Sequence, residues 1–167
     1  MTKPGPSSEI DLFIHWLDTQ RSHAIGILDG LSEENLRRPI TSSGWSCLGM
    51  IGHLTAMERF WYRKVILGEL GATSALTVSI EWHVPDTIAT EAVFASYRNE
   101  IALANSIIRA TPIDAVPAWW PDFFTQWRLH NLREVLLHTM TETATHAGHL
   151  DAARESIDRR QWFVLDV

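Results

Sequence analysis

The chain has 167 residues and a mass of 19.0 kDa, enough for one domain with its own hydrophobic core. Hydrophobic residues make up 46% and charged residues 20%, which excludes a disordered chain. The formal net charge of −6, with Lys and Arg scattered rather than clustered along the chain, gives no sign of the basic surface that nucleic acids require. A single cysteine favours a reducing compartment, and no apolar signal region or membrane span is apparent. We expect one cytoplasmic domain over residues 1–167, with no nucleic-acid or membrane partner.

Two amphipathic helices are predicted in the first 70 residues. The first begins after Ser8, whose hydroxyl can cap it, and runs to about Leu28 with apolar residues at three- and four-residue steps. The second runs from about Ser46 to Leu67. His53 lies on its apolar face, where a lone histidine is more often a hydrogen-bonded core residue than a metal ligand.

A third amphipathic helix is predicted from about Thr90 to Ala110, and Pro112 follows its end. Glycine and proline interrupt residues 68–89, which separate the second helix from the third. We expect this segment to be a loop.

Residues 116–127, the aromatic linker, contain no helical periodicity and many aromatic side chains. Long loops of this kind inside a compact domain tend to be functional or to cover something. Two roles are open: a lid that seals one end of the helices, or a surface that contacts substrate. The residues assigned to the second role are Trp119, Trp120 and Trp127.

The fourth predicted helix, from Leu132 to about Arg159, carries an acid and a histidine where apolar residues are expected. Glu142 and His146 lie one turn apart and project the same way. An ionised carboxylate on an inward face is costly unless a charge or a hydrogen bond meets it, and a cation is one such partner. The apolar tail at 161–167 is expected to dock on the domain or on a second subunit.

Four amphipathic helices without a convincing sheet predict an all-α four-helix bundle, whose facing helices are common positions for metal sites. His53, Glu142 and His146 would supply two nitrogens and one oxygen, the set typical of catalytic zinc and non-haem iron sites. Such a site keeps one position open for water or for a thiol. A di-iron carboxylate bundle is disfavoured, because its two Glu-x-x-His pairs are missing from the sequence.

Three stretches of the chain carry a family resemblance: Gly44-Trp-Ser46, Gly52-His-Leu54 with Glu58, and residues 142–158, which begin Glu-Thr-Ala-Thr-His-Ala-Gly-His. They resemble the DinB-like superfamily, in particular the branch containing the N-terminal domain of mycothiol-dependent maleylpyruvate isomerase. The resemblance covers essentially the whole chain. It implies an up-down-down-up four-helix bundle, frequent dimers, and a divalent metal, zinc or sometimes nickel. Carried over position by position, it implies His53, Glu142 and His146 as the ligands.

The leading functional hypothesis is therefore a divalent-metal-dependent enzyme that transfers a low-molecular-weight thiol, of the mycothiol or bacillithiol type, to a small electrophile. Zinc is the expected metal, nickel is the second choice, and a homodimer is the expected assembly. Two alternatives stay open: a non-enzymatic metal- or ligand-binding bundle of the stress response, and a metal-dependent hydrolase.

Other polar residues of the fourth helix have several possible roles. His149, three residues after His146, is a candidate catalytic residue: a proton shuttle, a substitute ligand, or a group that contacts a ligand or the substrate. The last role is favoured. His138 is predicted to be structural. Asp151 and Glu155 are either solvated acids or carboxylates that orient ligand imidazoles.

Overall fold

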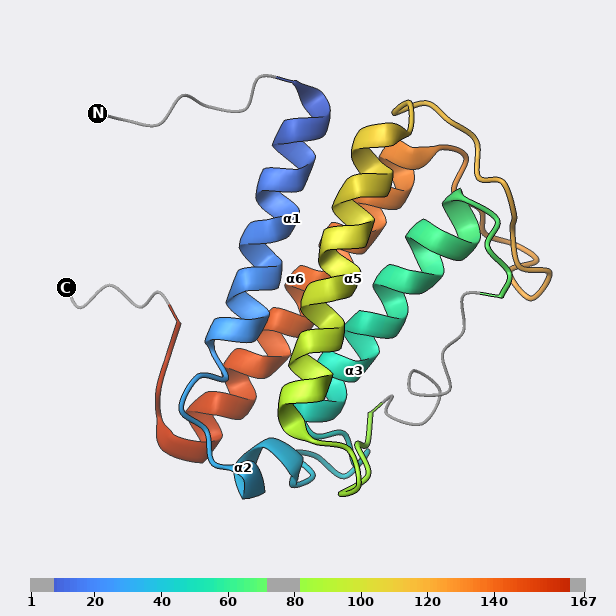
Figure 1. Ribbon diagram of the computed structural model, residues 1–167. Coiled ribbons are helices and arrows are strands. Elements are labelled where there is room, and N and C mark those ends of the chain that lie inside the picture. The colour runs from blue at the N-terminus through green and yellow to red at the C-terminus, as the bar shows by residue number, and fades with distance from the viewer. Residues whose placement is uncertain (1–7, 72–81, 163–167) are drawn as a thin grey trace, which may run out of the picture.

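The computed structural model describes residues 8–71 and 82–162, which form an α-helical protein (Figure 1). These residues contain no β-strand, so the all-α prediction is confirmed. The helices are α1 (Glu9–Gly26), α2 (Glu33–Arg37), α3 (Cys47–Glu58) with its π-helical continuation η1 (Arg59–Ile66), α5 (Thr90–Ala110) and α6 (Leu132–Asp158).

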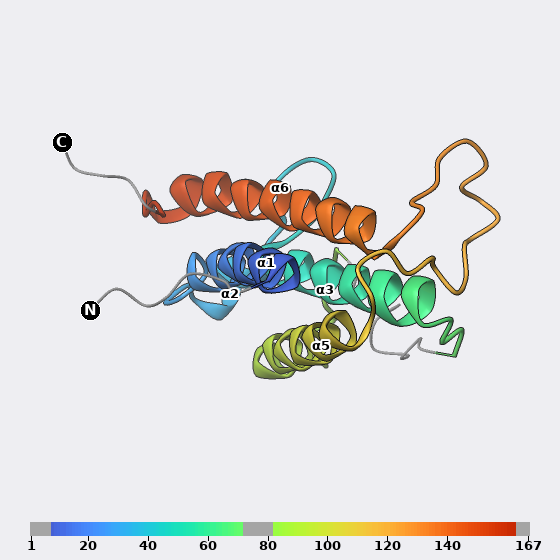
Figure 2. The same cartoon turned by 90° about the horizontal axis from the view of Figure 1, so that it is seen from above.

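Four long helices pack around one core. In Figure 1, α1 and α6 run from top to bottom, whereas α3 and α5 run from bottom to top. α1 packs chiefly against α6, and α3 packs against α5. Seen from above, α6 and α5 lie on opposite sides of α1 and α3 (Figure 2). The core between them contains fully buried aliphatic side chains, including Leu17, Ile51, Leu54, Ile108 and Leu132.

Local capping contacts explain where three of these helices begin. Ser8 accepts a hydrogen bond from the Asp11 amide at 3.1 Å, and Ser46 accepts one from the Gly49 amide at 3.0 Å. Asn131 accepts one from the Glu134 amide, so α6 starts at the predicted residue. Each cap satisfies an amide that the helix itself leaves without a partner.

The second predicted helix differs from expectation in its winding. After Glu58 the chain follows a π-helix, in which the Leu67 amide donates to the Tyr62 carbonyl five residues back. π-Helical turns are rare and occur frequently at functional sites. The wider turn brings Trp61 and Tyr62, successive residues, both into the interior. Apolar periodicity at 3.6 residues could not predict this arrangement.

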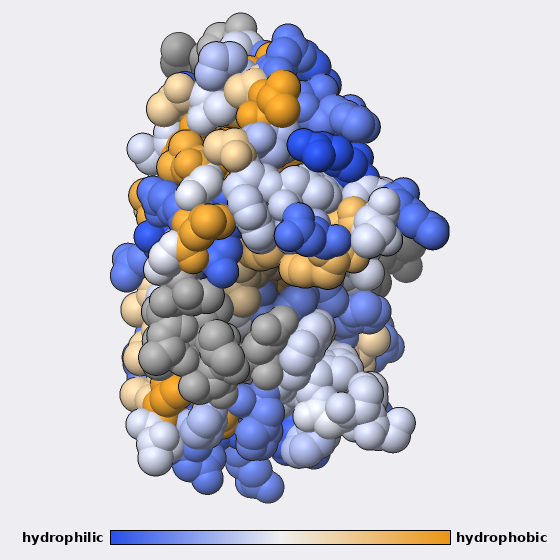
Figure 3. Space-filling view, turned by 90° about the vertical axis from the view of Figure 1, so that its right-hand side faces the viewer, coloured by the Kyte–Doolittle hydropathy of each residue, from blue (hydrophilic) through white to orange (hydrophobic). Residues whose placement is uncertain are grey.

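Outside the core, the surface is mixed. On the face shown in Figure 3, apolar residues occur in separate groups among hydrophilic ones. Within the described ranges, no helix is both long and apolar enough to cross a bilayer.

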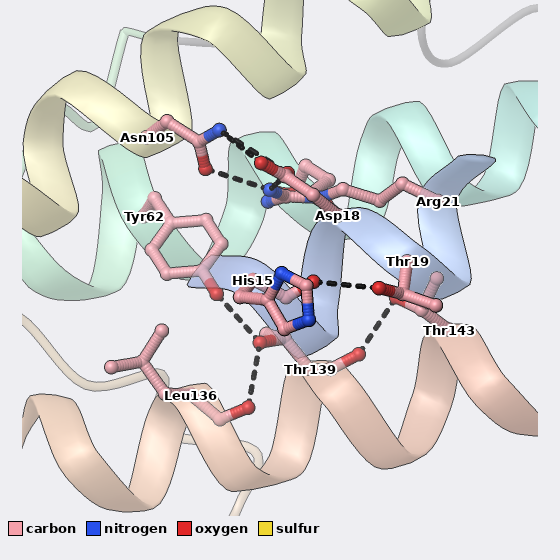
Figure 4. A network of polar contacts seen from close by, with 10 residues as sticks. His15, Asp18, Thr19, Arg21, Tyr62, Asn105, Leu136, Thr139 and Thr143 are labelled. Atoms are coloured by element: carbon pink, nitrogen blue, oxygen red, sulfur yellow. Dashed lines mark hydrogen bonds and ion pairs between the residues drawn. The ribbon is translucent and has the colours of Figure 1, made fainter. Parts of the chain in front are cut away.

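A buried polar network links α1, α3 and α5 (Figure 4). The Arg21 guanidinium donates to both carboxylate oxygens of Glu58, at 2.6 and 2.5 Å, and to Asp18 and Asn105 at 2.7 Å. Burial raises the pKa of the Glu58 carboxyl, and the Arg21 charge opposes that shift. Beside this network, Tyr62 and Thr139 share a 2.6 Å hydrogen bond.

The C-terminal tail is described only as far as Trp162. Its indole stacks on His23 of α1, with ring centroids 4.9 Å apart. Gly26 leaves room for this ring, because a Cβ there would lie 2.6 Å from the indole. The beginning of the tail thus docks on its own domain. Residues 163–167, and residues 72–81 of the predicted loop, lie outside the described residues.

Candidate metal centre

Side chains from α3 and α6 converge where the two helices face each other. His53 comes from α3, and Glu142 and His146 come from α6. One possible ligand atom from each of the three lies within 4.8 Å of the others. His146 Nε2 lies 3.4 Å from Glu142 Oε2, and the two imidazole rings have centroids 4.8 Å apart. Residues separated by about 90 positions in sequence therefore form one compact group of donors.

This donor set fits a small divalent cation. A tetrahedral zinc ion at about 2.0–2.2 Å from each donor separates the donors by roughly 3.4 Å, which small side-chain rotations would reach here. The His146 side chain is 12% exposed, and burial together with the adjacent His53 lowers its pKa. A lowered pKa favours the neutral imidazole, which is the form that binds metals.

Glu142 was predicted to lie on the inward face of its helix, and the structure corrects this prediction. Its side chain is 39% exposed, at the rim of α6 rather than inside. Solvent therefore reduces the cost of its charge.

Trp82 is the residue at this centre that sequence reasoning missed. Its indole stacks on the His53 ring, with centroids 4.0 Å apart and planes 21° apart, and it meets His146 at 6.0 Å. Trp82 lies within the segment predicted to be a loop, residues 68–89, where no periodicity indicates which side chain points inward. Beside it lies a cavity of about 390 Å³, lined by Ser43, Trp45, Met50, Trp82, His146 and His149.

His149, three residues after His146 on α6, also borders this cavity. Its Nδ1 is 3.3 Å from Nδ1 of His146, whose other nitrogen faces Glu142. A hydrogen bond between the two Nδ1 atoms would fix the tautomer of His146 and leave Nε2 free to act as a ligand. Of the roles open to His149, this contact favours the one in which it orients His146, a candidate metal ligand.

The acids farther along α6 have other partners. Asp151 Oδ1 lies 2.7 Å from His23 Nε2 of α1, and Glu155 accepts a hydrogen bond from Gln161 at 2.9 Å. These contacts tie α6 to α1 and to the tail. They favour structural roles over orientation of the ligand imidazoles.

Two other titratable side chains, Cys47 of α3 and His138 of α6, are buried to different degrees. Cys47 lies in the core, and burial raises the pKa of its thiol to about 11, which makes it a poor nucleophile. His138 packs between Trp61 and Trp127, at 4.7 and 5.1 Å, and burial lowers its pKa. The packing of His138 agrees with the structural role predicted for it.

The aromatic linker packs over one end of the bundle. Trp61 of η1 contacts Trp120 and Trp127 at 5.9 and 5.8 Å, and Trp119 lies 6.3 Å from Phe60. His138, which this cluster surrounds, precedes His146 by two helical turns, about 12 Å along the axis. The cavity beside the three donors is lined by Trp45 and Trp82 rather than by the linker tryptophans.

Comparison of the sequence with models of protein families gave a match. The family model described as Mycothiol-S-transferase matches residues 12–159, a range that includes all three candidate ligands. Comparison with individual curated proteins gave no match. Because the family match spans most of the chain, the protein belongs to the mycothiol-S-transferase family, a DinB-like family.

Proposed function

We propose that this protein is a divalent-metal-dependent S-transferase that joins a low-molecular-weight thiol of the mycothiol type to a small electrophile. The observation that carries the proposal is the group formed by His53, Glu142 and His146, with donors within 4.8 Å at the edge of a cavity. The family match supports a thiol as one substrate. We assign the whole chain, residues 1–167, to a single up-down-down-up bundle of the DinB-like type.

Each residue of the centre has a distinct task in this proposal. A divalent cation, zinc or nickel, would lower the pKa of a coordinated thiol and so favour the thiolate at neutral pH. His53 and His146 provide neutral nitrogen donors, and Glu142 provides a negative charge from the rim. His149 holds His146 in the required tautomer, and Trp82 shields His53 from water on one side. Three protein donors leave room for a fourth group.

The reaction itself requires little of the protein beyond binding and orientation. The thiol sulfur gives an electron pair to the electrophilic carbon, a carbon–sulfur bond forms, and the leaving group departs with its bonding pair. The thiol proton passes to solvent. Holding both reactants together removes the entropic cost of a bimolecular encounter.

The first prediction tests thiol transfer directly. Protein reconstituted with zinc is expected to accelerate the loss of free thiol when mycothiol is mixed with an alkyl or aryl halide, and chelator-treated protein is not. Thiol titration over time measures the rate. A fully metallated sample that accelerates no thiol–electrophile pair would contradict the proposal. Hydrolysis of an ester panel by that sample would favour the hydrolase alternative.

We also propose that the protein is a homodimer. Leu12 and Trp16, one turn apart on α1, are exposed, as is Leu137 of α6. An ion pair between Arg133 and Glu9 places the N-terminal ends of α6 and α1 side by side, so these apolar side chains belong to one end of the bundle. Exposed apolar groups of this kind are typical of an isologous interface.

The dimer prediction concerns Trp16, which is 52% exposed. Trp16→Glu would place a charge in the proposed interface, so light scattering at micromolar concentration should show a monomer with unchanged metal content. Leu103→Glu, at an exposed position of α5, is the matched control and should stay dimeric. A wild-type protein that is already monomeric under these conditions would refute the proposal.

A further inference from the structure

We infer that the cavity between Trp45 and Trp82, here called the indole pocket, binds the electrophile and selects flat, apolar molecules. The inference rests on the proposed function, because it assigns the second substrate of that reaction. Its volume of about 390 Å³ lies in the range of small-molecule sites. The other lining residues are Ser43, Met50, His146 and His149.

The position of the indole pocket suits the electrophile. His146 is both a candidate metal ligand and part of the pocket wall. A molecule held in the pocket therefore lies against the donor group where the thiol sulfur is expected. The reacting atoms can meet without movement of a helix.

The chemistry of the pocket wall suits an apolar ring rather than a polar headgroup. Two indoles and the thioether of Met50 supply the apolar part of the wall, Ser43 contributes a hydroxyl, and His146 and His149 contribute imidazoles. Among the described lining residues, none carries a carboxylate, ammonium or guanidinium group. A polyol or a charged group would lose water there without gaining enough partners. A flat aromatic molecule would instead gain stacking contacts.

A larger cavity elsewhere in the described residues has a more polar lining. It measures about 510 Å³ and lies along the aromatic linker, where Gln126, Arg128 and His130 accompany the aromatic rings. These side chains offer hydrogen bonds and positive charge. The contrast favours the indole pocket for an apolar electrophile.

The backbone holds Trp82 in an unusual conformation to form this wall. Its φ of 68° lies in the left-handed region, which costs a non-glycine residue about 1–3 kcal/mol. The Ser46 amide donates to the Trp82 carbonyl at 3.2 Å. Gly49 makes room for that carbonyl, because a Cβ there would lie 2.0 Å from its oxygen. Strain that the surrounding structure maintains is typical of binding sites.

Hydrogen bonds also hold the backbone of the segment that follows Trp82. The Arg37 guanidinium donates to three carbonyl groups of this segment, those of Val84, Pro85 and Ile88, at 3.3, 3.2 and 2.7 Å. Val84 itself is buried. These contacts fix the backbone that carries the indole, so the stacking of Trp82 on His53 is built into the fold and does not depend on substrate.

The test compares two unreactive probes with the same carbon skeleton, flat 2-naphthol and its saturated, non-planar analogue decahydro-2-naphthol. Titration calorimetry measures both with metal-loaded and metal-free protein. The wild type should bind 2-naphthol about tenfold more tightly, the size expected of one or two aromatic contacts. Trp45→Leu and Trp82→Leu should each lose most of this preference. Gly49→Ala should lose it as well, because its Cβ displaces the Trp82 carbonyl.

Trp127→Leu in the aromatic linker is the matched control and should keep the preference. Circular dichroism and metal analysis of each variant separate loss of the pocket from loss of the fold or of the metal. Equal affinity for the two probes in the wild type overturns the inference, as does a preference that survives both Trp45→Leu and Trp82→Leu. Probe binding requires no thiol, so a failure of the proposed transferase activity is observed separately from a failure of the indole pocket.

Discussion

Replacing His146 by alanine is expected to remove bound divalent metal and to abolish thiol transfer while the helical circular-dichroism spectrum persists. His146 lies close to both of the other donors: its Nε2 is 3.4 Å from Glu142 Oε2, and its ring centroid is 4.8 Å from that of His53. Loss of a residue that only hydrogen-bonds a ligand typically weakens metal binding by roughly 10–100-fold. Loss of one of the three ligands themselves should weaken it more. Elemental analysis after dialysis, followed by metal titration, measures this effect.

Variants of the neighbouring residues separate ligands from supporting groups. His53→Ala and Glu142→Ala should resemble the His146 variant. His149→Ala should bind metal roughly 10–100-fold more weakly, whereas His149→Asn, which keeps an acceptor for the His146 N–H, should recover much of that loss. The assignment is wrong if each of the three ligand variants retains one metal ion per chain.

Replacing Glu58 by alanine is expected to destabilise the protein by up to about 3–5 kcal/mol, because the buried charge of Arg21 would lose its fully buried partner and keep only the partly exposed Asp18 as a counter-charge. Both side chains are almost fully buried, at 1% and 0% exposure, and they share two hydrogen bonds. For a domain of this size the change corresponds to a melting temperature lower by roughly 6–20 °C. Thermal and urea unfolding, followed by circular dichroism, provide the measurement.

An exposed ion pair and a double variant are the controls. Arg109 and Asp11 form a pair at 2.6 Å in which the arginine is 57% exposed, so Arg109→Ala should cost less than about 1 kcal/mol. The double variant Arg21→Met with Glu58→Leu removes both charges and should be more stable than Glu58→Ala alone. If Glu58→Ala costs no more than Arg109→Ala, the buried pair does not stabilise the fold as argued.

Local signals in the sequence were sufficient to predict the four long helices, although not the π-helical winding after Glu58. The bounds Thr90–Ala110 of α5 and the start of α6 at Leu132 are those of the structure, since apolar spacing and caps such as Asn131 act over only a few residues. The pairing of Glu142 with His146 is equally local, because four residues make about one helical turn. His53 lies far from this pair in sequence. It entered the predicted ligand set because facing helices of a bundle are common positions for metal sites, and the family resemblance implied the same three residues.

The surroundings of the centre, in contrast, were decided by the tertiary structure. Trp82 reaches His53 from a left-handed conformation that local preference opposes. Its carbonyl accepts a hydrogen bond from the Ser46 amide in the space left by Gly49, and Arg37 holds the segment that follows. His23 and Asp151, 128 residues apart, likewise meet only when α1 packs on α6. Helical periodicity reports which face of one segment is apolar, whereas such contacts depend on how two segments approach each other. That approach is set by the packing of the whole core, which no short stretch of sequence contains.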